Sequence, residues 1–435
     1  MMQYYHTQTI NQDGCLTIGG IDVYTLKERF GTPLYIMDEM HIRKQCQWFQ
    51  RYFKKTGVDT EVIYASKAFM TIAMAKLIQQ EGLSLDVVSG GELYTAYKAG
   101  YPMAKVYFHG NNKSLKELQM ALDYGVGTIV LDNVFEYHRL VDLIEDTQSI
   151  NVLLRVNPGI EAHTHEYIAT TKNNSKFGMS IFDDNTLSFI ETITKHPNIK
   201  FTGLHSHIGS QIFEESSFID HANAIMAYVV KLKTSKNIVV ESINLGGGFG
   251  VQYTKEDRPI NSLNFLKNML EVIETSAKSL DVKTPKVMIE PGRAIVANSG
   301  ITLYEVGNAK TVHSKKRYCF VDGSMADHIR TALYQADYHC VLANRMKDPH
   351  NTEYTVTGKA CESGDIIIRT AYLPKPNPKD LLVVFSTGAY HYSMASNYNR
   401  LLKPPVIFVK DGEAKVVVKG ETFEDLIQND QDVTL

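Results

Sequence analysis

A regular alternation of short apolar runs and helical patterns is the feature of this sequence that most restricts its fold. It begins at residue 62 and contains eight apolar runs, most of them rich in β-branched or aromatic residues, as buried parallel strands are. The runs are Val62–Ser66, Leu85–Val88, Lys105–Phe108, Thr128–Leu131, Val152–Val156, Phe201–Ser206, Ile243–Leu245 and Val287–Glu290. Eight strands separated by helices predict a (β/α)8 barrel.

The segments between the first runs have the pattern of helices. The candidates are Met70–Gln80, Glu92–Ala99, Ser114–Tyr124 and Asn133–Glu145. Ser114 is followed three residues later by Glu117, which predicts a capping box at the start of its helix.

A change of rhythm near residue 298 predicts a second domain, and a length of 435 residues exceeds the usual size of one domain. Runs such as ITLYEVG, DIIIRTA, DLLVVFST and PVIFVKDG are strand-like and mostly not separated by helices, which indicates an antiparallel β domain. The stretches CLTIGGIDV and TPLYIMD near the N-terminus look similar, with no helix expected between them. We therefore expect a TIM-like barrel over residues 37–297 and a C-terminal antiparallel β-barrel or sandwich over 298–435, which is joined by N-terminal strands from 1–36.

Composition excludes several classes of partner. The net charge is −3 without long charged runs, so neither nucleic acid nor a membrane surface is expected as a partner. No secretory signal or apolar run of about 20 residues is found, which predicts a soluble cytoplasmic protein. The cysteines are odd in number, scattered and never in a C-x-x-C pair, which argues against disulfides and structural zinc; they are Cys15, Cys46, Cys319, Cys340 and Cys361.

Residues capable of chemistry gather at the carboxyl ends of the predicted strands. In barrels of this kind, that face carries the active site. The residues are Lys67, Asp86, Ser89, His109, Asn111, Arg155, Asn157, His205, His207, the run Gly246–Gly248, and Glu290 to Arg293. Their position predicts one site at one mouth of the barrel.

Lys67 closes the first strand in the stretch YASKAF. A lysine at a strand end is more often a solvated charge. Here the neighbours are apolar, and desolvation lowers the pKa of an ammonium group. The context therefore favours a neutral amine able to bind a carbonyl cofactor.

The stretches NLGGGFG and IEPGR favour a phosphate site with a carboxylate nearby. Consecutive glycines let backbone N–H groups approach an anion, although a tight turn would also use them. Barrel phosphate sites commonly follow the seventh and eighth strands, where these stretches stand. Glu290 either forms a salt bridge to Arg293 or keeps a pyridine nitrogen protonated, and His207 is able to stack on such a ring.

The sequence HSH, residues 205–207, also suits metal-dependent amide hydrolases. Those enzymes carry H-x-H on the first strand and a lysine near the middle, which is the reverse of the order here. No metal site is therefore predicted.

Two segments of the β domain carry further candidates. Arg330 and Tyr334 are four residues apart, on one face if the segment is helical. In CESGD, Cys361 is either a small buried hydrophobic residue or a proton donor beside Glu362. The Tyr/Ser/Asn-rich stretch GAYHYSMASNYN is suited to lining a pocket.

Taken in order, YASKAF, LDVVSGGEL, HGNNK, RVNPG, HSHIGSQ, NLGGGFG, IEPGR, CESGD and GAYHYSMASNYN resemble the diaminopimelate decarboxylases. These belong to a barrel-fold group of pyridoxal-phosphate enzymes that includes ornithine and arginine decarboxylases. The resemblance runs from about residue 20 to 430. It implies decarboxylation of meso-2,6-diaminopimelate to L-lysine and CO2, with pyridoxal 5'-phosphate as cofactor.

The resemblance also implies residue roles. Lys67 matches the lysine that holds the cofactor as a Schiff base, and Cys361 matches a proton donor supplied by the partner subunit of a homodimer. The implied cofactor-binding residues are Lys67, Asp86, His207, Ser210, Gly248, Glu290, Pro291, Gly292, Arg293 and Tyr390. The implied substrate-binding residues are Arg293, Arg330, Tyr334, Glu362 and Tyr390. One departure is Ser324 in DGSM, where a second glycine is expected.

Three other functions stay open on the sequence. A related decarboxylase would act on ornithine, arginine, or a siderophore or polyamine precursor. Diaminopimelate, however, has a distal carboxylate and amine, which Arg293, Arg330 and Glu362 match. A racemase would return inverted substrate with little CO2. A non-catalytic homologue should have lost Lys67 or Cys361, and both are present.

Overall fold

The computed structural model describes residues 5–160, 175–260 and 264–433. The chain divides into two compact units. The barrel unit comprises Gln45–Val251 and Arg258–Ala294, and the β unit comprises Met1–Lys44, Gln252–Asp257 and Ile295–Leu435. The domain bounds 1–36, 37–297 and 298–435 remain a prediction.

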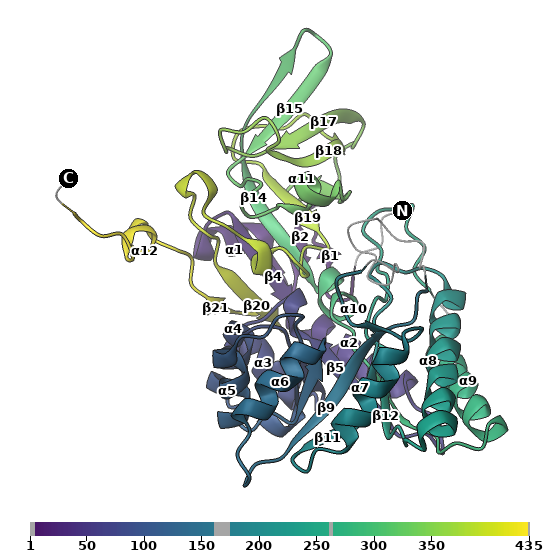
Figure 1. Cartoon of the computed structure of the whole chain (residues 1–435). Coiled ribbons are helices and arrows are strands. Elements are labelled where there is room, and N and C mark those ends of the chain that lie inside the picture. The colour runs from purple at the N-terminus through teal and green to yellow at the C-terminus, as the bar shows by residue number, and fades with distance from the viewer. Residues whose placement is uncertain (1–4, 161–174, 261–263, 434–435) are drawn as a thin grey trace. The chain divides into compact units, whose positions relative to one another are not determined.

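The barrel unit contains a closed ring of parallel strands, which confirms the predicted barrel (Figure 1). In chain order the strands are β5 (Thr60–Ala65), β6 (Ser84–Val87), β7 (Val106–Phe108), β8 (Thr128–Leu131), β9 (Ile150–Asn157), β11 (Ile199–His205), β12 (Ser242–Asn244) and β13 (Lys286–Ile289). Each strand pairs with the next, and β13 pairs with β5 to close the ring. A short strand, β10 (Met179–Ser180), pairs in parallel with the end of β9.

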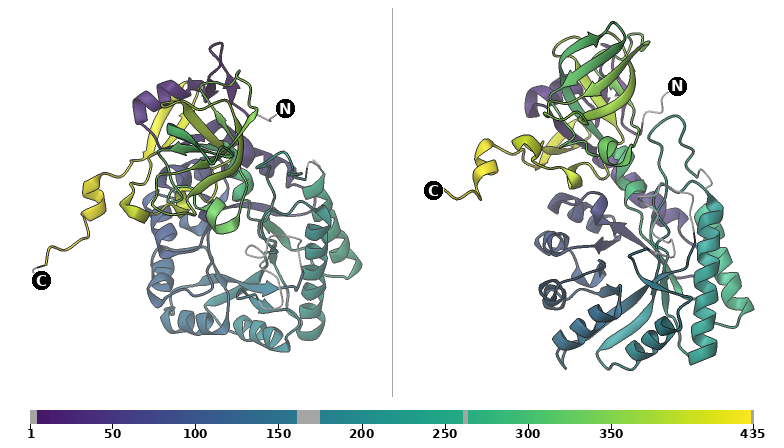
Figure 2. Two further views of the ribbon diagram at one scale, coloured as in Figure 1. Left: turned by 90° about the horizontal axis from the view of Figure 1, so that it is seen from above. Right: turned by 45° about the horizontal axis from the view of Figure 1, so that its top comes forward.

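Helices surround these strands on the outside (Figure 2). They are α3 (Ile72–Gln80), α4 (Gly90–Lys98), α5 (Leu115–Asp123), α6 (Val134–Leu143), α7 (Asp184–Thr194), α8 (Glu215–Lys236) and α9 (Phe265–Ser279). At the start of α5, Ser114 and Glu117 form the predicted capping box, so that prediction is confirmed. The helix α2 (Glu39–Tyr52) precedes β5.

The barrel interior changes from apolar to polar toward the carboxyl ends of the strands. An apolar cluster is formed by Ile63, Val130, Leu153 and Met288, with Tyr107 packed against it. Side chains two positions apart on a strand point to the same face. The next inward-facing positions after Tyr107, Val130, Leu153 and Met288 therefore belong to His109, Asp132, Arg155 and Glu290. The polar layer at the mouth thus follows directly from the alternation in the strands.

The β unit contains a small sheet and a large one. The small sheet has β1 (Thr9–Ile10), β2 (Leu16–Ile18) and β3 (Ile21–Asp22). The large sheet has β4 (Leu34–Asp38), β14 (Gly300–Val312), β15 (Lys316–Val321), β16 (Cys340–Leu342), β17 (Thr352–Thr357), β18 (Ile366–Leu373), β19 (Leu381–Phe385), β20 (Val406–Lys410) and β21 (Glu413–Val418). Strand β4 lies between β14 and β20.

Most pairings in the large sheet are antiparallel, as predicted, but β15 pairs with β17 and β4 with β20 in parallel. Two apolar clusters form the core, one of which joins residues from Leu16 to Val409. Short helices complete the unit: α11 (Arg330–Tyr334) and α12 (Phe423–Ile427). A further short helix, α10 (Arg293–Val296), follows the last barrel strand.

The expectation that no helix separates the two N-terminal strand stretches was wrong. Helix α1 (Val23–Phe30) lies between β3 and β4. The Asp22 carboxylate accepts hydrogen bonds from the backbone N–H groups of Tyr24 and Thr25, which starts the helix, and Val23 and Leu26 are buried. The signal was present as an N-cap aspartate at the end of a very short strand.

No helix in the described ranges has both the length and the apolar character needed to cross a membrane.

Candidate active site

Lys67 lies in a single 3-10 turn that directly follows β5. Its neighbours Tyr64, Ala65, Ala68 and Phe69 are buried, but Lys67 itself is exposed. The apolar neighbours point into the core and do not by themselves desolvate the amine, contrary to the expectation. The amine is nevertheless part of the barrel mouth, because its charge acts on Asp86 and His207.

Glu92 in α4 anchors the turn that carries Lys67. Its carboxylate oxygen Oε2 accepts hydrogen bonds from the Ser66 hydroxyl at 2.9 Å and from the Val88 backbone N–H at 2.7 Å. Burial raises the pKa of Glu92. Glu92 thus ties the end of β5 to the end of β6, a role that the sequence analysis missed.

Glu290 lies buried at the centre of the mouth, with 6% of its surface exposed. The Asn244 amide donates to its Oε1 at 2.7 Å, and His205 Nε2 lies 3.2 Å from its Oε2. His109 Nε2 is 2.8 Å from Oε1, although the N–H direction does not meet hydrogen-bond geometry. Burial opposes ionisation, but the two histidines hold the pKa of Glu290 well below its usual range. Glu290 pairs with these residues and not with Arg293.

His109, His205 and Glu290 present ligand atoms within 4.8 Å of one another, as a metal site would. The Asn244 N–H, however, points at Oε1 of the same carboxylate. An N–H donor is not a metal ligand and would face any cation bound there. The cluster is therefore better explained by hydrogen bonds from Asn244 and His205 to the Glu290 carboxylate than by a metal ion.

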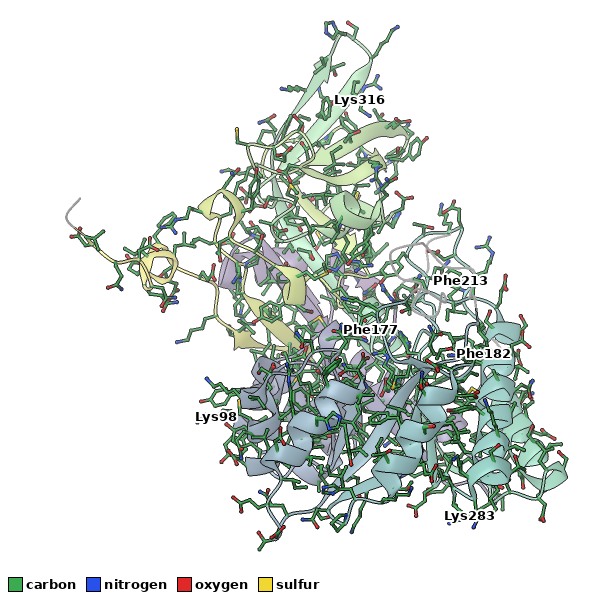
Figure 3. The ribbon with its side chains drawn as sticks, viewed as in Figure 1. Lys98, Phe177, Phe182, Phe213, Lys283 and Lys316 are labelled. Carbon is green, nitrogen blue, oxygen red and sulfur yellow. The ribbon has the colours of Figure 1, made fainter. Side chains whose placement is uncertain are left out.

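Asp86 and Arg155 complete the polar layer. Asp86 is 1% exposed, and its Oδ1 has no hydrogen-bond partner among the described residues. Burial raises its pKa to about 7, against the opposing effect of His109. The guanidinium of Arg155 lies 4.4 Å from the ring centre of Phe177, which Figure 3 labels, and burial lowers its pKa. The ionised Glu290 and Asp86, whose pKa is about 7, thus lie in the same polar layer at the barrel mouth.

The glycine run after β12 packs its backbone against the ends of neighbouring strands. A Cβ on Gly247 would lie 2.3 Å from the Glu290 carbonyl oxygen, and a Cβ on Gly248 would lie 2.7 Å from the Gly209 carbonyl oxygen. The Gly247 N–H donates to His207 Nδ1 at 3.2 Å. These close approaches account for the need for glycine, so the tight-turn interpretation is satisfied whatever the run binds.

Arg293 and Ser210 meet beside this run. Arg293 Nε and an Nη donate to the Ser210 hydroxyl at 3.2 and 3.1 Å. Arg293 is buried, and it follows Pro291 and Gly292 directly after β13. The predicted phosphate-holding residues of the barrel unit therefore lie on adjoining strand ends.

In the β unit, Arg330, Tyr334 and Tyr390 come together. The Arg330 guanidinium carbon is 4.8 Å from the ring centre of Tyr334 and 5.3 Å from that of Tyr390. Its Nε donates to the Tyr338 hydroxyl at 2.8 Å. The helical spacing predicted for Arg330 and Tyr334 is confirmed, whereas Tyr338 was missed.

Cys361 and Glu362 are both exposed in the β unit. The Cys361 N–H donates to Asn399 Oδ1 at 2.6 Å, and the Tyr398 hydroxyl donates to Glu362 Oε2 at 3.3 Å. Cys361 is therefore not a buried structural thiol. The segment GAYHYSMASNYN contacts both groups of candidate residues in this unit, through Tyr390 in one and Tyr398 and Asn399 in the other.

The barrel mouth fits pyridoxal phosphate. It offers an amine on Lys67, a buried ionised carboxylate on Glu290, and glycine backbone that no larger residue could provide. A family model, "Pyridoxal-dependent decarboxylase, pyridoxal binding domain", matches residues 39–297. Fold and site thus define the class of pyridoxal-dependent decarboxylases with a (β/α)8 barrel.

Comparison with individual proteins narrows this class. The diaminopimelate decarboxylase of Bacillus subtilis is 46% identical over 430 residues, 99% of this chain and 98% of that protein. That of Staphylococcus aureus is 44% identical over 98% of this chain and 99% of its own length. A crystal structure of the diaminopimelate decarboxylase from M. jannaschii in complex with L-lysine has a TM-score of 0.90 at 32% identity, with 98% of both chains covered. The chain belongs to the diaminopimelate decarboxylase family.

More distant structures share the fold alone. The lysine/ornithine decarboxylase of Vibrio vulnificus, solved with putrescine, has a TM-score of 0.73 at 22% identity and covers 89% of this chain and 97% of its own.

Proposed function

We propose that this chain decarboxylates meso-2,6-diaminopimelate to L-lysine and CO2 with pyridoxal 5'-phosphate as cofactor, and that it does so in the cytoplasm. The observation that best supports a decarboxylase is the ionised Glu290 at the barrel mouth, which also contains the Lys67 amine. The proposed cofactor residues are those that the sequence resemblance assigns. When bound, pyridoxal phosphate supplies an electron sink for the pair that a departing carboxylate leaves.

The residues of the chain would divide the remaining work. Lys67 would hold the cofactor through its aldehyde carbon, and Glu290 would keep a proton on the ring nitrogen. Ser210, Arg293 and the glycine backbone would bind the phosphate. The Cys361 thiol would deliver a proton to the α-carbon of the substrate.

Arg330 supports diaminopimelate over other diamino acids. It is 7% exposed and has no carboxylate partner in the described part of the chain. A buried guanidinium without a counter-ion is costly, so a ligand carboxylate is the natural partner. Ornithine and lysine as substrates would place only an ammonium group at their distal end.

A substrate panel tests the proposal. The purified protein with pyridoxal phosphate should release CO2 and lysine from meso-diaminopimelate and should have much lower kcat/KM for ornithine, arginine and lysine. Lys67→Ala should abolish this activity and also the borohydride-dependent labelling of the protein by the cofactor, because no amine remains at that position. A preference for ornithine, or inverted substrate without CO2, would reject the assignment.

We also propose a homodimer in which Cys361 serves the site of the partner subunit. The exposure of Cys361 supports this, because a proton donor must be reachable from outside its own unit. Lys67→Ala and Cys361→Ala proteins should each be nearly inactive, the latter by about 10²–10⁴-fold. Unfolding and refolding them together should restore about a quarter of the wild-type activity, because half of the random dimers carry one intact site of two.

The control for this mixing experiment is each variant refolded alone. Mixtures that stay inactive, although hybrid dimers are detected by differential tagging, would place Cys361 within its own subunit's site or outside the mechanism.

A further inference from the structure

Glu290 is held by side chains that no role in cofactor contact explains. The Asn244 amide N–H and the His205 Nε2 approach different oxygens of the carboxylate, at 2.7 and 3.2 Å. Both side chains are 1% exposed. A carboxylate whose two oxygens each have a donor cannot rotate about its last bond without losing a hydrogen bond in a low-dielectric interior.

Asn244 has a second contact that links Glu290 to the glycine run. Its Oδ1 accepts the Gly246 N–H at 2.9 Å, while its Nδ2 donates to Glu290. The backbone repeats the link, since the Glu290 N–H donates to the Gly246 carbonyl at 2.8 Å. One end of the amide must accept and the other must donate, so its orientation is fixed.

His205 offers its hydrogen bond as a neutral ring. Burial lowers its pKa to about 3, even though Glu290 opposes this. An ionised carboxylate only accepts hydrogen bonds, so the proton of the neutral imidazole is on Nε2. Met288, two residues before Glu290, belongs to the apolar cluster of the barrel interior. Because side chains two positions apart point to the same face, this cluster packs beneath the Glu290 carboxylate.

We propose that Asn244 and His205 are positioning residues that fix the Glu290 carboxylate toward the cofactor's ring nitrogen and, through Gly246, at a set distance from the phosphate end. The proposal rests on the proposed function, in which Glu290 serves that nitrogen. Asn244 and His205 would therefore act, through Glu290, on a single atom of the cofactor, its ring nitrogen. Their removal should weaken cofactor binding only when that nitrogen is present.

Two pairs of variants isolate this effect. Asn244→Asp keeps the shape and the acceptor for the Gly246 N–H but removes the donor to Glu290. His205→Leu removes the donor of the ring, whereas His205→Gln retains an amide N–H near the Nε2 position. Asn151→Asp makes the same change of charge at an exposed site and serves as the control.

The measurement is the dissociation constant of the apo protein for pyridoxal phosphate and for its deaza analogue, in which C–H replaces the ring nitrogen. The wild type should bind pyridoxal phosphate more tightly than the analogue. The ratio of the dissociation constant for the analogue to that for pyridoxal phosphate should fall about tenfold in Asn244→Asp and His205→Leu. A tenfold change is the scale of one hydrogen bond to a charged group. The ratio should persist in His205→Gln and Asn151→Asp.

Equal weakening of both cofactors, or an unchanged ratio, would show a merely structural role and overturn the proposal. A wild type that does not distinguish the two cofactors would instead refute the placement of Glu290 in the proposed function. If circular dichroism shows that Asn244→Asp does not fold, the comparison of His205→Leu with His205→Gln decides the question.

Discussion

Arg330 shows how a single residue determines which chemical group of a ligand a site can bind. Its guanidinium contacts the rings of Tyr334 and Tyr390, and within the described residues it donates a hydrogen bond to the Tyr338 hydroxyl. Aromatic faces and one hydroxyl stabilise the cation but do not neutralise it. The remaining N–H groups are suited to the two oxygens of a substrate carboxylate.

Removing this cation should weaken substrate binding more than turnover. Arg330→Met should raise the KM for meso-diaminopimelate by about 10- to 100-fold, the cost of about 1.5–3 kcal/mol for hydrogen bonds to a charged group. Steady-state kinetics would measure this. Tyr338→Phe, which frees only the Nε, should have a smaller effect in the same direction. A KM that does not change in Arg330→Met would place the substrate carboxylate elsewhere.

Individual residues were predictable from sequence where chemistry and position agreed. Lys67, Asp86 and Glu290 stand at strand ends with unusual side chains, so the barrel pattern alone placed them in the mouth. Asn244 and Glu92 were missed because their types are ordinary and their partners are distant in the chain. Their roles depend on which strand ends become neighbours, which no local pattern contains.

Helix α5 illustrates how a local signal survives into the fold. The Ser114 hydroxyl accepts a hydrogen bond from the Glu117 backbone N–H at 3.2 Å, and Glu117 Oε2 accepts one from the Ser114 backbone N–H at 2.9 Å. Glu117 Oε1 also accepts the Gly90 N–H at 2.8 Å, which connects the starts of α4 and α5. The capping residues therefore stabilise two helices together.

Ser114→Ala should lower the free energy of unfolding by about 1 kcal/mol, the usual cost of a lost N-cap. Glu117→Ala should cost more, because it also leaves the Gly90 N–H without its acceptor. Urea unfolding followed by circular dichroism measures both. Ser279→Ala, an exposed serine in the last turn of α9, should stay within about 0.5 kcal/mol and is the matched control. Equal stabilities for all variants would contradict the role of the box.

Strand and helix positions were largely accessible from periodicity, with ends shifted by one or two residues, as for β5 and β13. The pairing of the β-unit strands was not. The parallel neighbours β4 and β20 are separated by most of the chain, and period-two patterns specify a face without specifying a partner. The segment Gln252–Asp257, which belongs to the β unit although barrel segments flank it, likewise has no local signature.

At the scale of the molecule, buried histidines link stability to pH. Burial lowers the pKa of His221 and of His328 to about 3, one in each unit. An unfolded histidine binds a proton below about 6.5, whereas these folded ones do not, so stability falls as the pH drops from about 6.5. Asp86 and Asp327 have the opposite effect on stability. Burial raises the pKa of each to about 7, so the folded state binds the proton at a higher pH than the unfolded state, and stability rises as the pH drops below about 7.

His221 gives the cleanest test, since neither ring nitrogen has a hydrogen-bond partner in the described residues. His221→Leu should lose less stability than the wild type between pH 6.5 and 4.5, by up to about 1.4 kcal/mol per pH unit. Urea unfolding at a series of pH values measures the difference. The reference is pH 8, where His221 is neutral in both the folded and the unfolded wild type. Parallel pH curves for the two proteins would show that this histidine is protonated equally in both states.

Strand β4 belongs to the first tenth of the chain, yet it is hydrogen-bonded on both sides by strands that follow the entire barrel. On a ribosome, the last barrel strand is complete before either neighbour of β4 has been made, so folding cannot proceed in simple N-to-C order. Until Val406–Lys410 emerges, β4 keeps an open edge of the kind that recruits foreign strands. Growing chains of this protein thus expose the edge of an incomplete sheet until β20 has been made.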